Sequence, residues 1–216
     1  MGRHPSAPGL LITTGCSCLF VALAIGVLTG GPLVHFDRSI ADALHTYASE
    51  APSLTNSFRV VSILGSLEVL ALVGVLVAVM LLVQRSWVAL AAWLVAVLGG
   101  EVLNLLHKDL FARPRPSFEH PLVVETSYSF PSGQAIESVV VYRMLAYFVV
   151  LTSRAWGKRA VSVGGAAMIV LLIGFSRIYL GVHYVSDVVG GFAAGGAWLS
   201  AVITAWDAMR RRDIAN

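Results

Sequence analysis

Charged residues are scarce in this sequence, and their scarcity argues against several classes of protein. Lys, Arg, Asp and Glu make up 12% of the 216 residues, whereas hydrophobic residues make up 57%. An ordinary soluble domain carries about 25% charged and about 45–50% apolar residues. The net charge of +3 is too small for the basic surface that binds DNA or RNA. The composition therefore disfavours a soluble enzyme and a nucleic-acid-binding protein, and a lipid bilayer is the expected solvent.

Cysteine is also rare. The only two cysteines, Cys16 and Cys18, lie two residues apart within an apolar run. Free cysteine in such a setting behaves as a small hydrophobic residue. The pair is therefore expected to pack against its neighbours, and it indicates neither a disulfide nor a redox compartment.

Six long apolar runs account for most of the chain. Most are close to the roughly 20 residues that a helix needs to cross the hydrocarbon core, and none alternates with period two as a membrane barrel does. The runs cover residues 10–29, 60–83, 87–106, 134–152, 160–175 and 185–206. The first run ends without a small-x-small cleavage site and is expected to remain as an anchor. The sequence predicts an all-α polytopic membrane protein with six transmembrane helices in a single domain, residues 1–216.

Lys and Arg residues set the expected orientation. Some Lys and Arg residues belong to the polar clusters described next and are not counted here. If the amino terminus is in the cytoplasm, most of the remaining Lys and Arg residues lie in the inner loops, as the positive-inside rule requires. Both termini are then cytoplasmic, and the polar loops at 107–133 and 176–184 lie on the outer, periplasmic side. The short loops indicate a bacterial inner membrane. Residues 37–50 are expected to form an amphipathic helix at the outer interface, with Asp37 as its N-cap.

A histidine and an aspartate stand at the start of the sixth run. His183 and Asp187 are four residues apart, so they share one face of a helix. The carboxylate can accept a hydrogen bond from one imidazole nitrogen, which leaves the other nitrogen as a nucleophile or base. Arg177 lies shortly before them. Taken alone, the pair is equally typical of a hydrogen bond that caps a helix at the interface.

Two further clusters add cations and a helix N-terminus. Residues 108–116, KDLFARPRP, supply Lys108 and Arg115, whose side chains suit phosphate oxygens; Arg113 is expected to anchor this segment at the interface. Residues 129–134, SFPSGQ, place Ser132 and Gly133 before the fourth run. The backbone amides of Ser132 and Gly133 and the hydroxyl of Ser132 are expected to form an anion site at the helix N-terminus. The alternative is that Ser132 caps the helix. A phosphate site explains all three clusters together.

The chain resembles the type 2 phosphatidic acid phosphatase (PAP2) superfamily of membrane phosphatases, whose ordered motifs are K-x6-RP, PSGH and SR-x5-H-x3-D. The matching residues, within about 100–195, are Lys108, Arg115 and Pro116, then Pro131, Ser132 and Gly133, then Ser176, Arg177, His183 and Asp187. The resemblance implies a bundle of six spanning helices, a site near the outer surface, and no metal or other cofactor.

The resemblance also implies roles for these residues. His183 would attack phosphorus and form a phosphohistidine, and Asp187 would orient and polarise it. The groups that would hold the phosphoryl oxygens and stabilise the transition state are Lys108, Arg115, Arg177, Ser132 and the amide of Gly133.

One position departs from the family pattern. Gln134 stands where the second motif has histidine, which in the family protonates the leaving oxygen. Glutamine has no titratable proton, and general acid catalysis is typically worth about 10²–10⁴-fold. We expect the change to weaken hydrolysis of a phosphate ester more than that of a pyrophosphate, whose leaving phosphate is a weaker base. Glu137, one helical turn from Gln134, is a candidate replacement for the missing acid.

Four charged residues lie within the predicted spans. Glu68 is in the second span, Glu101 in the third, and Glu137 and Arg143 in the fourth. A charge at the bilayer centre costs at least about 2.5–3.5 kcal/mol, so Arg143 should have a partner. Glu68 or Glu101 is the expected one, because Glu137 is on a different face of the same helix. The set forms either a structural ion pair or a polar path or headgroup pocket.

The leading hypothesis is a membrane phosphatase that acts on a lipid phosphate or pyrophosphate, such as an isoprenoid pyrophosphate, phosphatidate or phosphatidylglycerophosphate. The alternative is a PAP2-like protein that binds or transports such lipids with little turnover, which Gln134 and Arg143 favour. A substitution at Gln134 that disables an enzyme is a third interpretation. Membrane lipids are expected partners, and nucleic acid is not.

Overall fold

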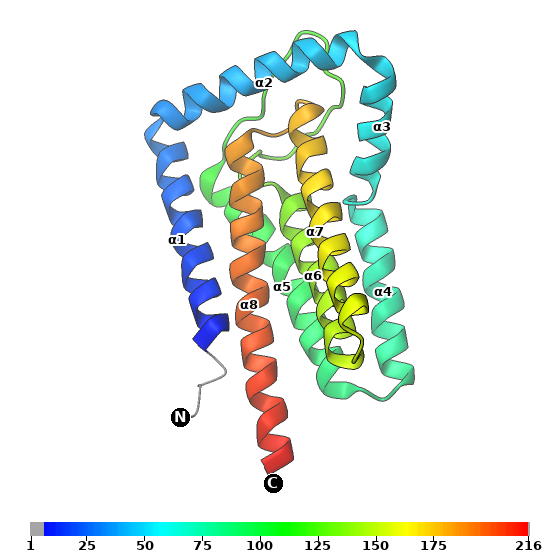
Figure 1. Ribbon diagram of the computed structural model, residues 1–216. Helices are drawn as coiled ribbons and strands as arrows, with labels where there is room; N and C mark the ends of the chain where they lie inside the picture. The colour runs from blue at the N-terminus through cyan, green and yellow to red at the C-terminus, as the bar shows by residue number, and fades with distance from the viewer. Residues whose placement is uncertain (1–6, 216) are drawn as a thin grey trace.

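The computed structural model describes the backbone of residues 7–215 and the side chains of residues 8–209. The described chain consists of helices and their connections (Figure 1). The helices are α1 (Ala7–Thr29), α2 (Pro32–Glu50), α3 (Pro52–Ile63), α4 (Leu67–Val83), α5 (Trp87–Phe111), α6 (Gly133–Thr152), α7 (Trp156–Tyr179) and α8 (Val185–Ala215).

Six segments are long and apolar enough to cross a membrane, which confirms the predicted all-α fold with six spans. They are Pro8–Thr29, Pro52–Val83, Trp87–Phe111, Gly133–Thr152, Trp156–Tyr179 and Val185–Met209. Leu, Ile and Val side chains cover their outward faces, as expected where lipid replaces water around a bundle. Because the spans are even in number, α1 begins and α8 ends at the same end of the bundle (Figure 1).

The second span differs from its predicted extent, because two helices share it. A break over residues 64–66 separates α3 from α4. Ser66 caps α4, and its Oγ accepts a hydrogen bond from the amide of Val69 at 3.4 Å. The hydroxyl of Tyr142, on α6, donates to the carbonyl of Leu64 at 2.6 Å. The break is thus satisfied partly by α6, and it leaves Gly65 beside the polar cavity described below.

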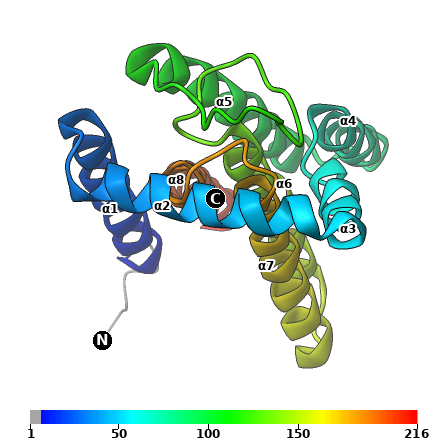
Figure 2. The same ribbon diagram turned by 90° about the horizontal axis from the view of Figure 1, so that it is seen from above.

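The predicted interfacial helix is present but begins earlier than expected. It starts at Pro32, whose fixed φ suits the first helical turn, and its N-cap is Gly31. Asp37 therefore lies inside α2 and is fully buried, so its assignment as the N-cap was wrong. Seen from above, α2 crosses the end of the bundle from α1 to α3 and passes over α8 and α7 (Figure 2).

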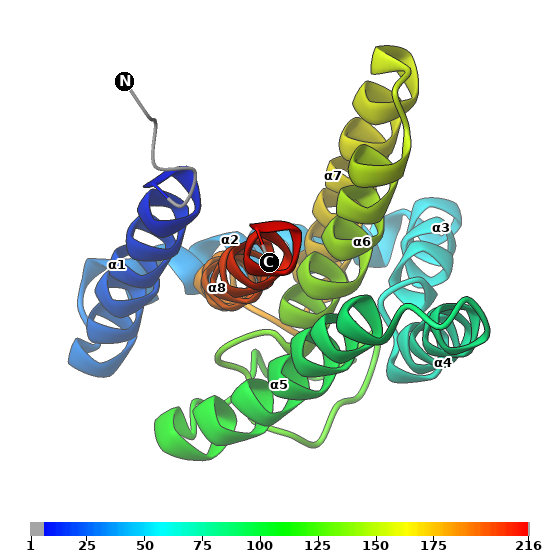
Figure 3. The ribbon, with the colours of Figure 1, turned by 90° about the horizontal axis from the view of Figure 1, so that it is seen from below.

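Helix α6 forms the centre of the core. It contacts α4, α5, α7 and α8, and Ile136, Val140, Val141 and Met144 are completely buried. The view from below shows α6 and α8 inside the bundle, with α1 at one side against α8 (Figure 3). The residues at the start of α6 (132–134) and at the start of α8 (185–187) therefore have fixed positions relative to each other.

Two glycines allow α8 to approach α6 closely. A Cβ added to Gly195 would lie 2.8 Å from the carbonyl oxygen of Ile136, and one on Gly191 would lie 2.6 Å from that of Ser132. These are backbone atoms that a rotamer change cannot move away. Small residues at helix contacts are typical of membrane bundles.

We expect Gly195→Ala to lower the free energy of unfolding by about 1–3 kcal/mol, the usual cost of overpacking. The matched control is Gly165→Ala on α7, where nothing lies within 4 Å of the added methyl group. Thermal unfolding of the detergent-purified variants measures both. Equal midpoints for the two variants would contradict this packing.

Candidate active site

The three polar clusters of the sequence meet at the end of the bundle that α2 covers. They surround a cavity of about 240 Å³ between α4, α5, α6 and α7. Its lining residues are Gly65, Leu67, Leu70, Glu101, Asn104, Lys108, Arg115, Glu125, Gly133, Gln134, Glu137, Arg177 and His183. Of the residues predicted for phosphate binding and catalysis, Ser132 and Asp187 are the two outside this lining. Both are fully buried directly behind it.

His183 presents one ring nitrogen to the cavity and the other to a carboxylate. Its Nε2 lies 3.1 Å from Nη1 of Arg115, and its Nδ1 lies 3.5 Å from Oδ2 of Asp187. Guanidinium groups only donate hydrogen bonds, so the Nε2 facing Arg115 carries the lone pair and Nδ1 carries the proton. Asp187 faces the ring as predicted, but His183 lies in the turn before α8 rather than on a helix face shared with Asp187. At 3.5 Å the contact is longer than a normal hydrogen bond, and Nδ1 makes none to the described residues.

The surroundings of His183 keep its imidazole neutral at pH 7. The pKa of His183 is lowered to about 4, mainly because the ring is buried; Arg115 and Arg177 contribute to this shift, and Asp187 opposes it. An imidazole with this pKa is uncharged at pH 7, and its Nε2 lone pair is available for attack.

Asp187 belongs to a buried ionic network that sequence reasoning did not find. Its Oδ1 accepts from Nη1 of Arg113, and its Oδ2 accepts from the amide of Tyr184 at 2.8 Å. Nη2 of Arg113 donates to Oδ2 of Asp37 at 2.8 Å. Arg113 is 7% exposed and both aspartates are 0% exposed. The prediction that Arg113 is an interfacial anchor was therefore wrong: its guanidinium joins α2 to α8.

Ser186 completes this network. It donates through its hydroxyl to Asp37, and its amide donates to the second oxygen of the same carboxylate at 3.0 Å. Nη1 of Arg113 also donates to the Ser186 hydroxyl at 2.8 Å. The guanidinium lies 4.2 Å above the ring of Tyr184, where a cation–π contact stabilises it. Every charge in the network thus has an opposite charge and hydrogen bonds, which a buried ion pair requires.

The loop at residues 112–132 arranges the cavity cations. Nζ of Lys108 and Nη2 of Arg115 each lie 3.0 Å from the hydroxyl of Ser127, and Arg115 Nε donates to its carbonyl at 2.6 Å. Arg177 donates to Glu125 and, at 2.6 Å, to Ser62. Burial raises the pKa of Glu125, but Arg177 and Arg115 together hold it below its usual value. The loop therefore adds Ser127 and an ionised Glu125 to the predicted cations.

Of the two residues predicted to form an anion site at the start of α6, only Gly133 lines the cavity. The amide of Ser132 donates to the carbonyl of Asp187 at 2.9 Å, so it is not free for a ligand. The Ser132 hydroxyl is buried without a hydrogen-bond partner. Gly133 does line the cavity, and a Cβ there would lie 2.7 Å from Nδ2 of Asn104. A larger residue here would have to displace the Asn104 side chain.

Gln134 contributes a polar side chain but no acid. Its Oε1 is buried and makes no hydrogen bond to the described residues. A Cβ on Gly65 would lie 3.1 Å from this oxygen. The side chain therefore extends toward the break between α3 and α4.

The charged residues of the spans are divided between two sides of α6. Glu101 and Glu137 line the polar cavity, and Glu68 is exposed in the first turn of α4. Arg143 instead lines a groove between α6, α7 and α8. Among the described side chains, no ion pair joins Arg143 to Glu68 or Glu101. The expected pairing was wrong, because Arg143 faces α7 and α8 rather than α4 and α5.

The donors around the cavity suit an anion. Lys108, Arg115 and Arg177 converge on the cavity that His183 also lines. Within residues 8–209, no group of three or more His, Cys, Asp or Glu side chains is arranged to hold a metal ion. Three cations beside a neutral imidazole are the arrangement that can bind a phosphoryl group and attack it.

A family profile described as the PAP2 superfamily matches residues 86–211, more than half of the chain. The chain belongs to the PAP2 superfamily. The match includes all three motif clusters and the helices that hold them. It begins after α4, so α1 to α4 lie outside it.

Named relatives agree with this assignment. Phosphatidylglycerophosphatase B of Bacillus subtilis (strain 168) is 41% identical over 129 residues, which cover 58% of this chain and 62% of the relative. An undecaprenyl-diphosphatase of Sulfolobus acidocaldarius is 32% identical over 114 residues, which cover 50% of this chain and 48% of the relative. The matched part of the chain thus spans less than two thirds of either relative.

A solved structure extends the likeness to the whole bundle. It is described as the first transmembrane PAP2 type phosphatidylglycerolphosphate phosphatase from Bacillus subtilis. The TM-score is 0.80 at 31% identity, over 89% of this chain and 94% of that chain. The chain is therefore an integral membrane protein with the PAP2 fold.

The pKa of His183 can be measured directly. In protein labelled with ¹⁵N-histidine and purified in detergent, we expect one ring to titrate near pH 4 and to stay neutral above it. His183→Ala should remove that signal and leave the other rings in place. A His183 midpoint near the unperturbed value of about 6.5 would show that burial does not hold the imidazole neutral.

The bridging role of Arg113 predicts a loss of stability in Arg113→Lys. An ammonium group cannot donate in a fork to Asp37 and Asp187 together, and breaking a buried pair can cost about 3–5 kcal/mol. We expect a lower free energy of unfolding, measured by thermal unfolding in detergent. Arg38→Lys, at an exposed position of the same region, is the matched control. The prediction fails if both variants unfold alike.

Proposed function

We propose that this protein is a membrane-embedded phosphatase that hydrolyses a lipid phosphate or pyrophosphate through a phosphohistidine at His183. One observation carries the proposal: the Nε2 of a buried, neutral imidazole faces a cavity that Lys108, Arg115 and Arg177 also line. The names of the relatives, a phosphatidylglycerophosphatase and an undecaprenyl-diphosphatase, support the same reaction class.

The proposed reaction has two displacements at phosphorus. Nε2 of His183 attacks, the bond from phosphorus to the leaving oxygen breaks, and that oxygen takes up a proton. The three cations stabilise the negative charge that develops on the phosphoryl oxygens. Asp187 orients the ring and stabilises the positive charge that the imidazole gains. Water then attacks the phosphohistidine, its proton passes to a base, and phosphate leaves His183 as it was.

An apolar groove supports an amphiphilic substrate. It lies between α4 and α5, has a volume of about 260 Å³, and is lined by apolar side chains together with Glu101 and Glu137. It shares Leu67, Leu70, Glu101 and Glu137 with the polar cavity. A phosphate group in the cavity would thus have an apolar surface beside it for a lipid chain. Gln134 favours a pyrophosphate among such lipids, because its leaving phosphate needs less help from an acid.

The alternative is a protein that binds or transports lipid phosphates with little turnover. The absence of an acidic proton at Gln134 favours this alternative. The ionic network behind His183 opposes it, because binding alone does not require an oriented, neutral imidazole. We therefore retain the enzyme as the proposed function.

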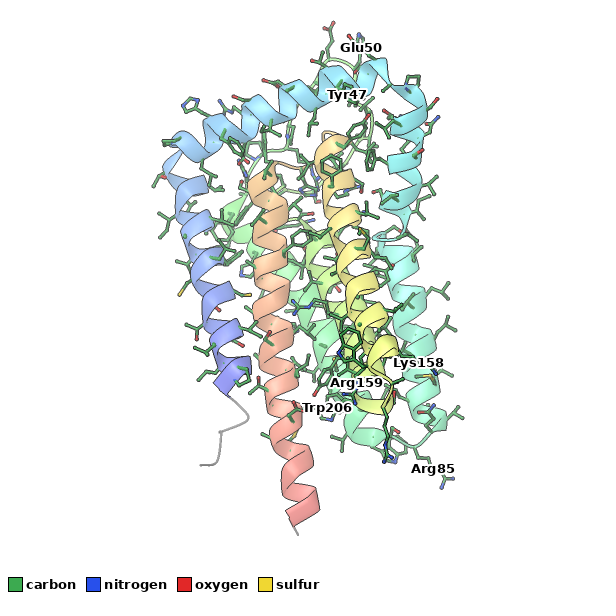
Figure 4. The ribbon with its side chains drawn as sticks, viewed as in Figure 1. Tyr47, Glu50, Arg85, Lys158, Arg159 and Trp206 are labelled. Carbon is green, nitrogen blue, oxygen red and sulfur yellow. The ribbon has the colours of Figure 1, made fainter. Side chains whose placement is uncertain are left out.

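We also propose that the site faces the outside of a bacterial inner membrane and that both termini face the cytoplasm. Arg85, Lys158 and Arg159 lie at the end of the bundle opposite Glu50 and α2 (Figure 4). Lys and Arg residues are enriched in cytoplasmic loops. Cysteine labelling of the loops in intact cells, at position 85 and position 50, would test this orientation.

Phosphate release tests the proposed activity. Three detergent-purified proteins are compared: the parent chain, Gln134→His and His183→Ala. Each is given an isoprenoid pyrophosphate, phosphatidate or phosphatidylglycerophosphate. We expect the parent chain to release phosphate, Gln134→His to act faster on the esters, and His183→Ala to be inactive.

The same panel separates the alternatives. Activity that survives His183→Ala would contradict the proposed nucleophile. Binding of these lipids without release by the parent chain would favour the binding protein, and turnover by Gln134→His alone would identify a disabled enzyme.

A further inference from the structure

Gln134 leaves the proposed reaction without an evident source for the proton that the leaving oxygen requires. Other titratable side chains line the same cavity. Lys108, Arg115 and Arg177 are engaged as cations with Ser127 and Glu125, and they are needed on the phosphoryl oxygens. Glu125 pairs with Arg177, and its lowered pKa keeps it ionised. The carboxyl groups of Glu101 and Glu137 remain.

Glu137 is the better placed of the two. It is 8% exposed, whereas Glu101 is only partly buried. No hydrogen bond to the described residues reaches its Oε1, and no cation pairs with it among them. A Cβ on Gly100 would lie 3.0 Å from this oxygen, so the absence of a side chain there gives the carboxyl its space. An isolated carboxylate is costly to bury, and the neutral acid is the form that such a site accommodates.

The position of Glu137 also suits the leaving group. It lies three residues beyond Gln134 on α6, about 4.5 Å along the helix axis. It lines both the polar cavity and the apolar groove between α4 and α5. A lipid with its phosphate among the cations and its chain in that groove has its leaving oxygen between the two. Glu137 lies at this junction, where the polar cavity meets the apolar groove.

We propose that Glu137 is the general acid of this protein and replaces the histidine that Gln134 lacks. The inference rests on the proposed function. In the first step the carboxyl proton passes, directly or through one water, to the leaving oxygen as the bond to phosphorus breaks. In the second step the attacking water gives its proton to the Glu137 carboxylate, which restores the acid. Asn104 donates to Glu101 at 3.3 Å and keeps that second carboxyl beside the junction.

The test compares two substrates that differ in the basicity of the leaving oxygen. A short-chain phosphatidate releases its diacylglycerol as a strongly basic alkoxide, and p-nitrophenyl phosphate releases weakly basic p-nitrophenolate. We expect Glu137→Gln to lower kcat on the phosphatidate by about 10²–10⁴-fold, the usual contribution of general acid catalysis. The first-turnover release of p-nitrophenolate, which reports the acid step alone, should change little, whereas hydrolysis of the phosphohistidine slows for both substrates. Glu68→Gln, an exposed glutamate on α4, should match the parent chain on both substrates.

Rescue distinguishes an acid from a structural residue. Adding Gln134→His to Glu137→Gln should restore turnover of the phosphatidate, because a second acid then lies at the position that the family motif uses. Equal losses on both substrates in the first turnover, or a double variant that is not rescued, would overturn the role of Glu137. So would a Glu137→Gln variant with the kcat of the parent chain.

Failure of the proposed function has a different signature. In that case the parent chain releases no phosphate from any substrate, or the His183→Ala variant releases phosphate as fast as the parent chain. Either result would overturn both the proposed function and the inference. A parent chain that requires His183 but is indifferent to Glu137 would overturn the inference alone.

Discussion

The buried ionic network of Asp37, Arg113 and Asp187, which contacts the neutral ring of His183, is the interaction on which the proposed site depends. Arg113 touches both carboxylates, and Asp187 touches both Arg113 and the histidine ring. Removing Arg113 would leave both carboxylates buried without a cation, which is far costlier than losing a surface pair. This network orients the imidazole of His183 through Nδ1, while Nε2 of the same ring faces the cavity. It also joins α2 to α8, so the cover of the bundle and the proposed nucleophile are positioned by the same contacts.

The membrane explains why the polar groups collect at one end. Most outward-facing side chains along the spans are apolar, and most backbone groups are satisfied within helices, as a bilayer requires. Polar loops can form only at the ends, and the loop at 112–132 and the turn at 180–184 share the end that α2 covers. Glu101 and Glu137 extend this polar region one to two turns into the bundle, beside an apolar groove. The arrangement suits a molecule that is charged at one end and apolar at the other.

Much of the fold could be predicted from the sequence, because six apolar runs and their lengths are local properties. The motif spacing likewise identified Lys108, Arg115, Arg177 and His183, which one cavity brings together. Asp37 was misjudged because its partners are 76 and 149 residues away, and no local pattern links them. Arg113 was misjudged for the same reason. Glu125 and Ser127 lie in a loop without periodicity, and only the folded loop shows that they contact the cations. Asn104 had a weak signal, since it shares a face of α5 with Glu101 and Lys108.

The central claim is that Nε2 of His183 becomes covalently bound to phosphorus, and trapping that bond tests it most directly. The protein would be mixed with a ³²P-labelled lipid phosphate, quenched within milliseconds in alkali, where phosphohistidine survives, and digested for peptide mapping. The account predicts an acid-labile label on the peptide that contains His183, formed and lost at rates that match turnover. Phosphate release without any label on this histidine, or a label on another residue, would contradict it.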